Sequence, residues 1–225
     1  ITQTIIFVDE TSPLITTNDQ ILEATISGGT DLTIEMPIVD DIQNTNITND
    51  APEVFPLGET IVTWTATDSS GNSASATQTV TVVDTTSPVL IAPESMEIEA
   101  RGLVTNIEDF GNIVAEDISG IAAITNDAPE VFPLGETIVT WTATDDYGNS
   151  VSNTQSIMII DTTSPSISAP SDLQIEANHI EQNIVDLTGV RVSDQVEVSS
   201  ITNDAPEVFP LGETIVTWTA TDSSG

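Results

Sequence analysis

The chain has 225 residues, of which 36 are acidic and 2 are basic, so its formal net charge is −34. This balance argues against nucleic acids and anionic membranes as partners, because clustered lysine and arginine bind both. The chain has no cysteine for a disulfide or a thiolate metal site. It also has no run of the roughly 18 apolar residues needed for membrane insertion.

The first nine residues, ITQTIIFVD, align with residues 76–84, ATQTVTVVD. A linker, DETSP, begins at Asp9. We therefore expect residues 1–9 to be the last strand of a preceding or neighbouring module. Residues 10–84 then form the first complete module.

The second half of this module has the period of β-strands. In the segment Thr60–Asp68, Val62 and Trp64 share one face while threonines occupy the other. The segment Ser73–Val83 alternates in the same way. The residues between the two segments include Gly71, which predicts a hairpin turn.

The chain then repeats itself. The sequence of Ile47–Asp68 recurs unchanged at Ile124–Asp145 and Ile201–Asp222, each time 77 residues further on. The linker recurs as DTTSP at residues 84–88 and 161–165. We expect residues 85–161 to form the second module and residues 162–225 a third that lacks its last strand. Short strands at this spacing predict an all-β protein of tandem immunoglobulin-like β-sandwich modules in an elongated array.

Together, DTTSP, the later EIEA and the run VFPLGETIVTWTATDSSGN resemble the hyalin repeat (HYR) domain. The resemblance implies an immunoglobulin-like fold and an extracellular, often adhesive, protein at the cell surface. Many members carry a cysteine pair, which this chain lacks. Tandem, acidic, cysteine-free modules further indicate a surface protein of a prokaryote, and archaea are among the candidate hosts.

Acidic residues gather where such a sandwich receives its linker. In an immunoglobulin-like sandwich, the loop between the second and third strands and the last hairpin lie at the same end as the incoming linker. The candidate metal ligands are Asp9, Asp40, Asp41 and Asp68 in the first module, Asp84, Glu116, Asp117, Asp145 and Asp146 in the second, and Asp161, Asp194 and Asp222 in the third. Carboxylates of this kind are ligands for calcium. The alternative is that they are ordinary turn residues. Transition metals lack ligands, since the chain has one histidine.

The two ends of the chain are complementary. The chain begins with what is expected to be the last strand of a module, and it stops at Gly225, the counterpart of Gly71, before the last strand of the third module. Two interpretations stay open. The chain is part of a longer tandem chain, or the first strand of one copy completes the third module of the next. The second is donor-strand exchange and gives a head-to-tail homopolymer.

These features favour a structural extracellular protein that builds a cell-surface fibre, stalk or lattice. The alternative is an adhesin that binds a protein or glycan through the variable half of the modules, where the available aromatic residues are Tyr147 and Phe110. An enzyme is not expected, since no nucleophile or catalytic pair stands out from the many acids. One sequon places a candidate glycosylation site at Asn46.

Overall fold

The computed structural model describes residues 1–180 and 183–224, and all of their regular structure is β-strand. The predicted all-β class of tandem immunoglobulin-like sandwiches is confirmed. Gly225, the counterpart of Gly71, lies outside the described residues. None of the elements within this part of the chain is a helix with the length and apolar character needed to cross a bilayer.

The chain divides into two compact units. One consists of Ile1–Ile91, Ile113–Thr125 and Trp141–Asn153, and the other of Ala92–Asn112, Asn126–Thr140 and Thr154–Gly225. The first unit therefore holds the first repeat together with the end of the second repeat that receives the linker. The second unit holds the opposite end of the second repeat and all of the third.

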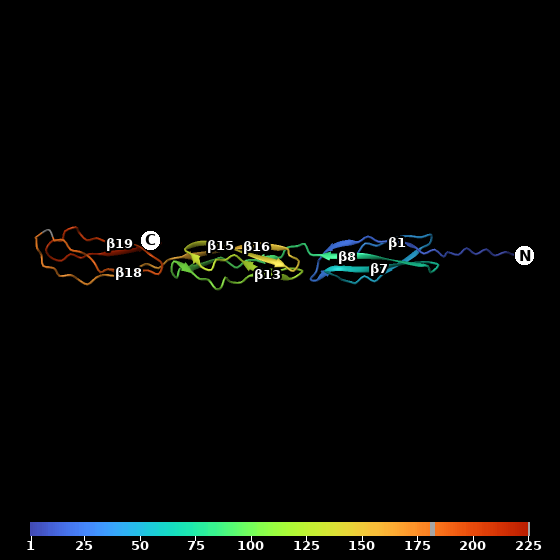
Figure 1. The fold of residues 1–225 in the computed structure, drawn as a ribbon, viewed down its shortest axis with the longest axis horizontal. Helices are drawn as coiled ribbons and strands as arrows, with labels where there is room; N and C mark the ends of the chain where they lie inside the picture. Colours follow the sequence, from blue (N-terminus) through green and yellow to red (C-terminus); the bar gives the residue numbers. More distant parts are fainter. Residues whose placement is uncertain (181–182, 225) are drawn as a thin grey trace. The chain divides into compact units, whose positions relative to one another are not determined.

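The first repeat contains a four-stranded sheet in the order β2-β8-β7-β5 and two small sheets, β1-β4 and β3-β6 (Figure 1). Strand β2 runs parallel to β8, and the remaining pairs are antiparallel. The strands are β1 Leu14–Thr16, β2 Gln20–Glu23, β3 Gly29–Thr30, β4 Ile38–Asp40, β5 Thr45–Asn49, β6 Phe55–Pro56, β7 Gly58–Asp68 and β8 Ser73–Val83.

The hairpin of β7 and β8 forms as the alternation predicts. Val62, Trp64, Val80 and Val82 point inward and belong to one buried cluster. The threonines between them face outward, because successive side chains of a strand alternate across the sheet. Gly71 in the connecting turn has φ +94°, a conformation that residues with a Cβ rarely adopt.

A buried glutamine ties this core together. Gln78 is 1% exposed, and its Oε1 accepts a hydrogen bond of 2.8 Å from Nε1 of Trp64. Its Nε2 donates to the carbonyl oxygen of Asn18 over 2.7 Å. Because both polar groups are paired, a buried amide is compatible with the apolar surroundings.

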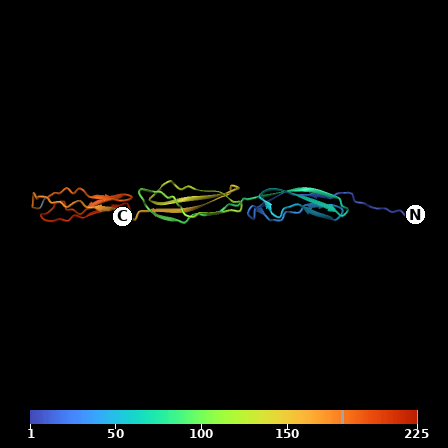
Figure 2. The ribbon, with the colours of Figure 1, turned by 90° about the horizontal axis from the view of Figure 1, so that it is seen from below.

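The second repeat has a sheet in the order β10-β16-β15-β13, with β15 and β16 side by side in both views (Figures 1 and 2). Its smaller sheets are β9-β12 and β11-β14. The strands are β9 Val89–Ile91, β10 Met96–Glu99, β11 Val104–Thr105, β12 Val114–Glu116, β13 Ile121–Asn126, β14 Phe132–Pro133, β15 Gly135–Asp145 and β16 Ser150–Ile160.

The third repeat differs from the other two. Its strands are β17 Ser166–Ser168, β18 Arg191–Ser193, β19 Val198–Asn203 and β20 Trp218–Asp222, paired as β17-β18 and β19-β20. Trp64 and Trp141 are buried, whereas Trp218 is half-buried, because the described residues place no strand equivalent to β8 beside β20.

Candidate metal centres

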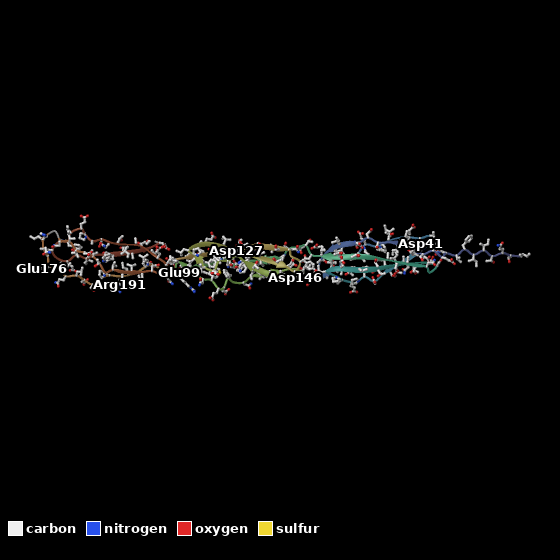
Figure 3. The ribbon with its side chains drawn as sticks, viewed as in Figure 1. Asp41, Glu99, Asp127, Asp146, Glu176 and Arg191 are labelled. Carbon is white, nitrogen blue, oxygen red and sulfur yellow. The ribbon has the colours of Figure 1, made fainter. Side chains whose placement is uncertain are left out.

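Three carboxylates meet at the entrance of the first repeat. Asp9 directly precedes the linker, Asp41 follows β4, and Asp68 ends β7. One oxygen from each lies within 4.8 Å of the others. Figure 3 shows Asp41 at the end of the repeat that receives the N-terminal segment.

Hydrogen bonds hold this first group in place. The side-chain amide of Asn72 donates to the carbonyl oxygen of Asp9 over 3.1 Å and to Oδ2 of Asp68 over 2.8 Å. The amide of Gln43 donates to Oδ2 of Asp9 over 2.8 Å. Burial raises the pKa of Asp68 and hydrogen bonds from Asn72 lower it, and the result is a pKa below the ordinary value of 3.8.

A second group repeats this arrangement between the first and second repeats. It consists of Asp84 after β8, Asp117 after β12 and Asp145 at the end of β15, again with oxygens within 4.8 Å of one another. The amide of Asn149 donates to the carbonyl oxygen of Asp84 over 3.1 Å and to Oδ2 of Asp145 over 2.8 Å. All three carboxylates belong to the first compact unit.

The second group contains an unpaired buried oxygen. Asp84 is 5% exposed, its Oδ1 accepts hydrogen bonds from Thr86, and its Oδ2 has no hydrogen-bond partner. Burial raises the pKa of Asp84, but the nearby side chains of Ser119 and Thr86 lower it by more, so the pKa lies below its ordinary value. A buried, charged oxygen without a partner is costly unless a cation compensates it.

The third set of predicted ligands is arranged differently. Asp161 is 9% exposed and its Oδ2 also lacks a hydrogen-bond partner. Asp194 is half-buried, with Oδ1 accepting from the backbone of Val196, and Asp222 is buried. Across residues 1–180 and 183–224, carboxylates meet in groups of three at the first two junctions but not at this one.

Three further predicted ligands stand outside the two groups. Asp40, Glu116 and Asp146 are all exposed. Asp40 and Glu116 are the last residues of β4 and β12. Each immediately precedes the aspartate that faces inward, so the alternation of an extended chain turns it to solvent.

The sequence analysis missed the amide side chains. Asn72 and Asn149 are absent from the predicted ligands, yet each ties the carbonyl group of a linker aspartate to the hairpin of the repeat that follows. Their position directly after a turn glycine in both hairpins was the available signal. No such signal exists for Gln43, because the equivalent position in the second group, two residues after the aspartate, is Ser119.

The second group has the chemistry of a hard-cation site. It offers carboxylate oxygens only, and calcium accepts about six to eight oxygen ligands in flexible geometry. Three carboxylates at such distances repel one another unless a positive charge lies between them. The chain has no lysine and only two arginines with which to supply that charge.

The other predicted site, Asn46, lies in β5 at the edge of the first sheet and is exposed. Of the two aromatic residues predicted to be available to a partner, Tyr147 is 50% exposed. Phe110 is half-buried, and its ring centroid lies 6.1 Å from that of Phe132.

Comparison with known proteins identifies similar sequences. Residues 8–82 match the profile of a family described as the HYR domain. The whole chain aligns with a hyalin of Strongylocentrotus purpuratus at 35% identity over 250 residues and with a hyalin of Lytechinus variegatus at 33% identity over 254 residues. The chain spans 21% and 46% of the lengths of these two relatives.

Among solved structures, the extracellular cadherin domains 1–4 of protocadherin gamma B7 align with 94% of this chain, which corresponds to 68% of that chain. The identity is 14% and the TM-score is 0.33.

Proposed function

Because the chain belongs to the HYR domain family, we propose that it serves as a structural repeat segment of a cell-surface fibre, stalk or lattice, with calcium bound at its module junctions. Proteins of this family are extracellular and non-enzymatic, and the chain is an adhesion-type repeat protein of that kind. The calcium sites and the form of the assembly are the proposed part.

The observation that carries the calcium proposal is the unpaired Oδ2 of Asp84 within the second group. Asp117 and Asp145 complete a set of oxygens from two successive modules. Nearby, Ile118 packs against the buried cluster of the first repeat. A cation at this place neutralises the repulsion between the carboxylates and joins the last strand of one module to the loops of the next.

Calcium binding is tested by thermal unfolding of the full chain in calcium and in chelator. A ligand that binds only the folded state stabilises it by about 2.7 kcal/mol at 100 times its Kd. We expect calcium to raise the melting temperature and Asp84→Asn to remove most of that rise. Asp146→Asn is the matched control, because Asp146 is exposed and stands outside the group.

Two outcomes contradict the calcium proposal. In one, the melting temperature is the same in calcium and in chelator. In the other, Asp84→Asn and Asp146→Asn respond to calcium like the unchanged chain, which reduces the grouped acids to turn residues. Magnesium in place of calcium checks ion preference, because magnesium requires a stricter octahedral geometry.

For assembly, we propose head-to-tail association by strand exchange. The N-terminal segment carries large exposed apolar residues, including Ile5 at 70% and Phe7 at 95% exposure. The third repeat carries an open cavity of about 820 Å³ beside its half-buried Phe209 and Trp218. Exposed apolar side chains of an extended segment are expected to become buried against partly buried aromatic side chains of a sheet edge.

A further inference from the structure

The loop that follows β12 carries a candidate ligand and an apolar side chain next to each other. Asp117 belongs to the second group of carboxylates, and Ile118 packs against the buried cluster of the first repeat. Oδ1 of Asp117 accepts hydrogen bonds of 2.8 Å from both the backbone N–H and the hydroxyl of Ser119. Because this turn fixes the backbone around both neighbours, a displacement of the carboxylate also displaces Ile118.

The carboxylates of the second group are held from both sides of the joint between the first two repeats. On one side, Glu23 at the end of β2 accepts hydrogen bonds from the backbone N–H of Thr85 over 2.7 Å and from its hydroxyl over 3.0 Å. These two bonds anchor Asp84, the residue before Thr85, to the first repeat. Asp117 and Asp145 belong to the second repeat. A cation that binds all three therefore holds the loop of the second repeat against the first.

Two opposing effects act on this loop. Packing of Ile118 removes apolar surface from water and favours the position of the loop against the first repeat. Without a cation, the like charges of carboxylates within 4.8 Å of one another push Asp117 away from Asp84. Because Asp84 is buried, salt screens this repulsion less than it would at the surface. A bound cation replaces the repulsion by attraction, so that both effects then favour the same position.

We propose that calcium in the second group controls the packing of Ile118: the cation holds the loop of residues 117–119 on the first repeat, and its removal shifts the loop toward a released position. The inference rests on the proposed calcium site and adds the way in which that site regulates the joint. Because binding equilibria are reciprocal, the contact that calcium strengthens also strengthens calcium binding by the same factor. Ile118 is thus a positioning residue for the cation.

The corresponding loop of the third repeat has the same turn with a different side chain. Oδ1 of Asp194 accepts a hydrogen bond of 2.7 Å from the backbone N–H of Val196, two residues further on. The residue between them is Gln195, which is exposed. The turn therefore forms with glutamine as well as with isoleucine at its centre. Replacing Ile118 by glutamine accordingly removes the apolar contact and keeps the shape of the loop.

The first test measures the calcium affinity of the full chain by titration calorimetry. We expect Ile118→Gln to weaken binding at the second group about tenfold, which lies within the usual range for coupled sites. Ile118→Val keeps an apolar side chain and should bind calcium nearly as well as the unchanged chain. Ile138→Gln is the matched control, since Ile138 is 51% exposed on β15 and lies outside the cluster of the first repeat.

The second test observes the contact itself by nuclear magnetic resonance of the full chain with isotope-labelled methyl groups. In calcium, we expect nuclear Overhauser contacts between the methyl groups of Ile118 and the buried cluster of the first repeat. In chelator, these contacts should weaken. In Asp84→Asn, they should no longer respond to calcium, whereas Asp146→Asn should respond like the unchanged chain.

The outcomes separate this inference from the calcium proposal. If calorimetry detects no calcium binding, the calcium site and its coupling to Ile118 are both overturned. If calcium binds and Ile118→Gln binds it as tightly as the unchanged chain, the calcium site stands and the coupling is wrong. Contacts of Ile118 that are equally strong in calcium and in chelator also refute the coupling and leave the site in place.

Discussion

The side-chain amide of Gln43 donates to Oδ2 of Asp9 over 2.8 Å inside the first group of carboxylates. In the second group the corresponding oxygen, Oδ2 of Asp84, has no partner. The two groups are otherwise built alike, down to the asparagine that ties each linker aspartate to its hairpin. The difference makes the groups unequal as binding sites.

We expect calcium to fill the second group before the first. A cation that enters the first group competes with the amide of Gln43, whereas the second group offers a free oxygen. Titration calorimetry of the full chain should show a tight and a weak class of site, with Asp84→Asn removing the tight class and Asp9→Asn the weak one. Loss of the tight class in Asp9→Asn would reverse this order. Asp146→Asn should leave both classes intact.

The Trp64–Gln78 bond gives a prediction about stability. Gln78→Leu keeps the approximate size of the side chain but leaves the buried N–H of Trp64 without its acceptor. The expected cost is about 1–3 kcal/mol in the free energy of unfolding. Adding Trp64→Phe should cost less than the sum of the single changes, because both ends of the bond are then apolar. Additive costs in denaturant titrations would mean that the bond contributes nothing.

Two chemically identical substitutions should differ in effect. Phe55 is 3% exposed and belongs to the core of the first repeat, so Phe55→Ala should destabilise that repeat by about 3–5 kcal/mol. Phe209→Ala removes a half-buried ring and should cost clearly less in the unassembled chain. Amide hydrogen exchange reports each repeat separately. Equal losses of protection in the two variants would contradict the difference in packing.

The hydrogen bond between Asp204 and Thr217 leads to a prediction about pH. Oδ1 of Asp204 accepts a hydrogen bond of 2.6 Å from the backbone N–H of Thr217, which holds the pKa of Asp204 below its ordinary value of 3.8. The stabilising contribution is therefore complete above the unfolded-state pKa and is lost as the pH falls through the lower folded-state pKa.

Amide exchange of Thr217 should accordingly show constant protection from neutral pH down to about 4, relative to the intrinsic rate, and declining protection below it. Asp204→Asn should lower the protection and remove its acid dependence. Asp172→Asn, at an exposed position in the same repeat, is the control. An unchanged acid dependence in Asp204→Asn would assign the effect to another group.

Calcium at the junctions, strand exchange and the prokaryotic origin stay predictions, while the match of residues 8–82 to the HYR domain and the similarity of the whole chain to hyalins are shown. The distinction has a physical basis. Family and fold depend on patterns that recur along the chain, whereas a bound ion and a docked strand depend on groups that meet only after folding.

The sequence by itself determined the strands and the hairpin of the first repeat's second half and the places where acids collect. Thr60–Asp68 and Ser73–Val83 could be predicted because the period of two and the turn glycine act locally. The sequence also predicted that Asp84, Asp117 and Asp145 share one end of a module, since the order of strands in a sandwich places their loops there.

Only the tertiary structure decided which carboxylates face one another. Asp40 and Asp41 are chemically equal neighbours, yet one is exposed and the other belongs to the first group, because the direction of each side chain depends on where its strand ends. Likewise, Trp64 and Trp218 have identical local sequences and different burial. Trp64 bonds to Gln78 in β8, the next strand of its hairpin, so the burial of a side chain depends on a strand outside its own segment.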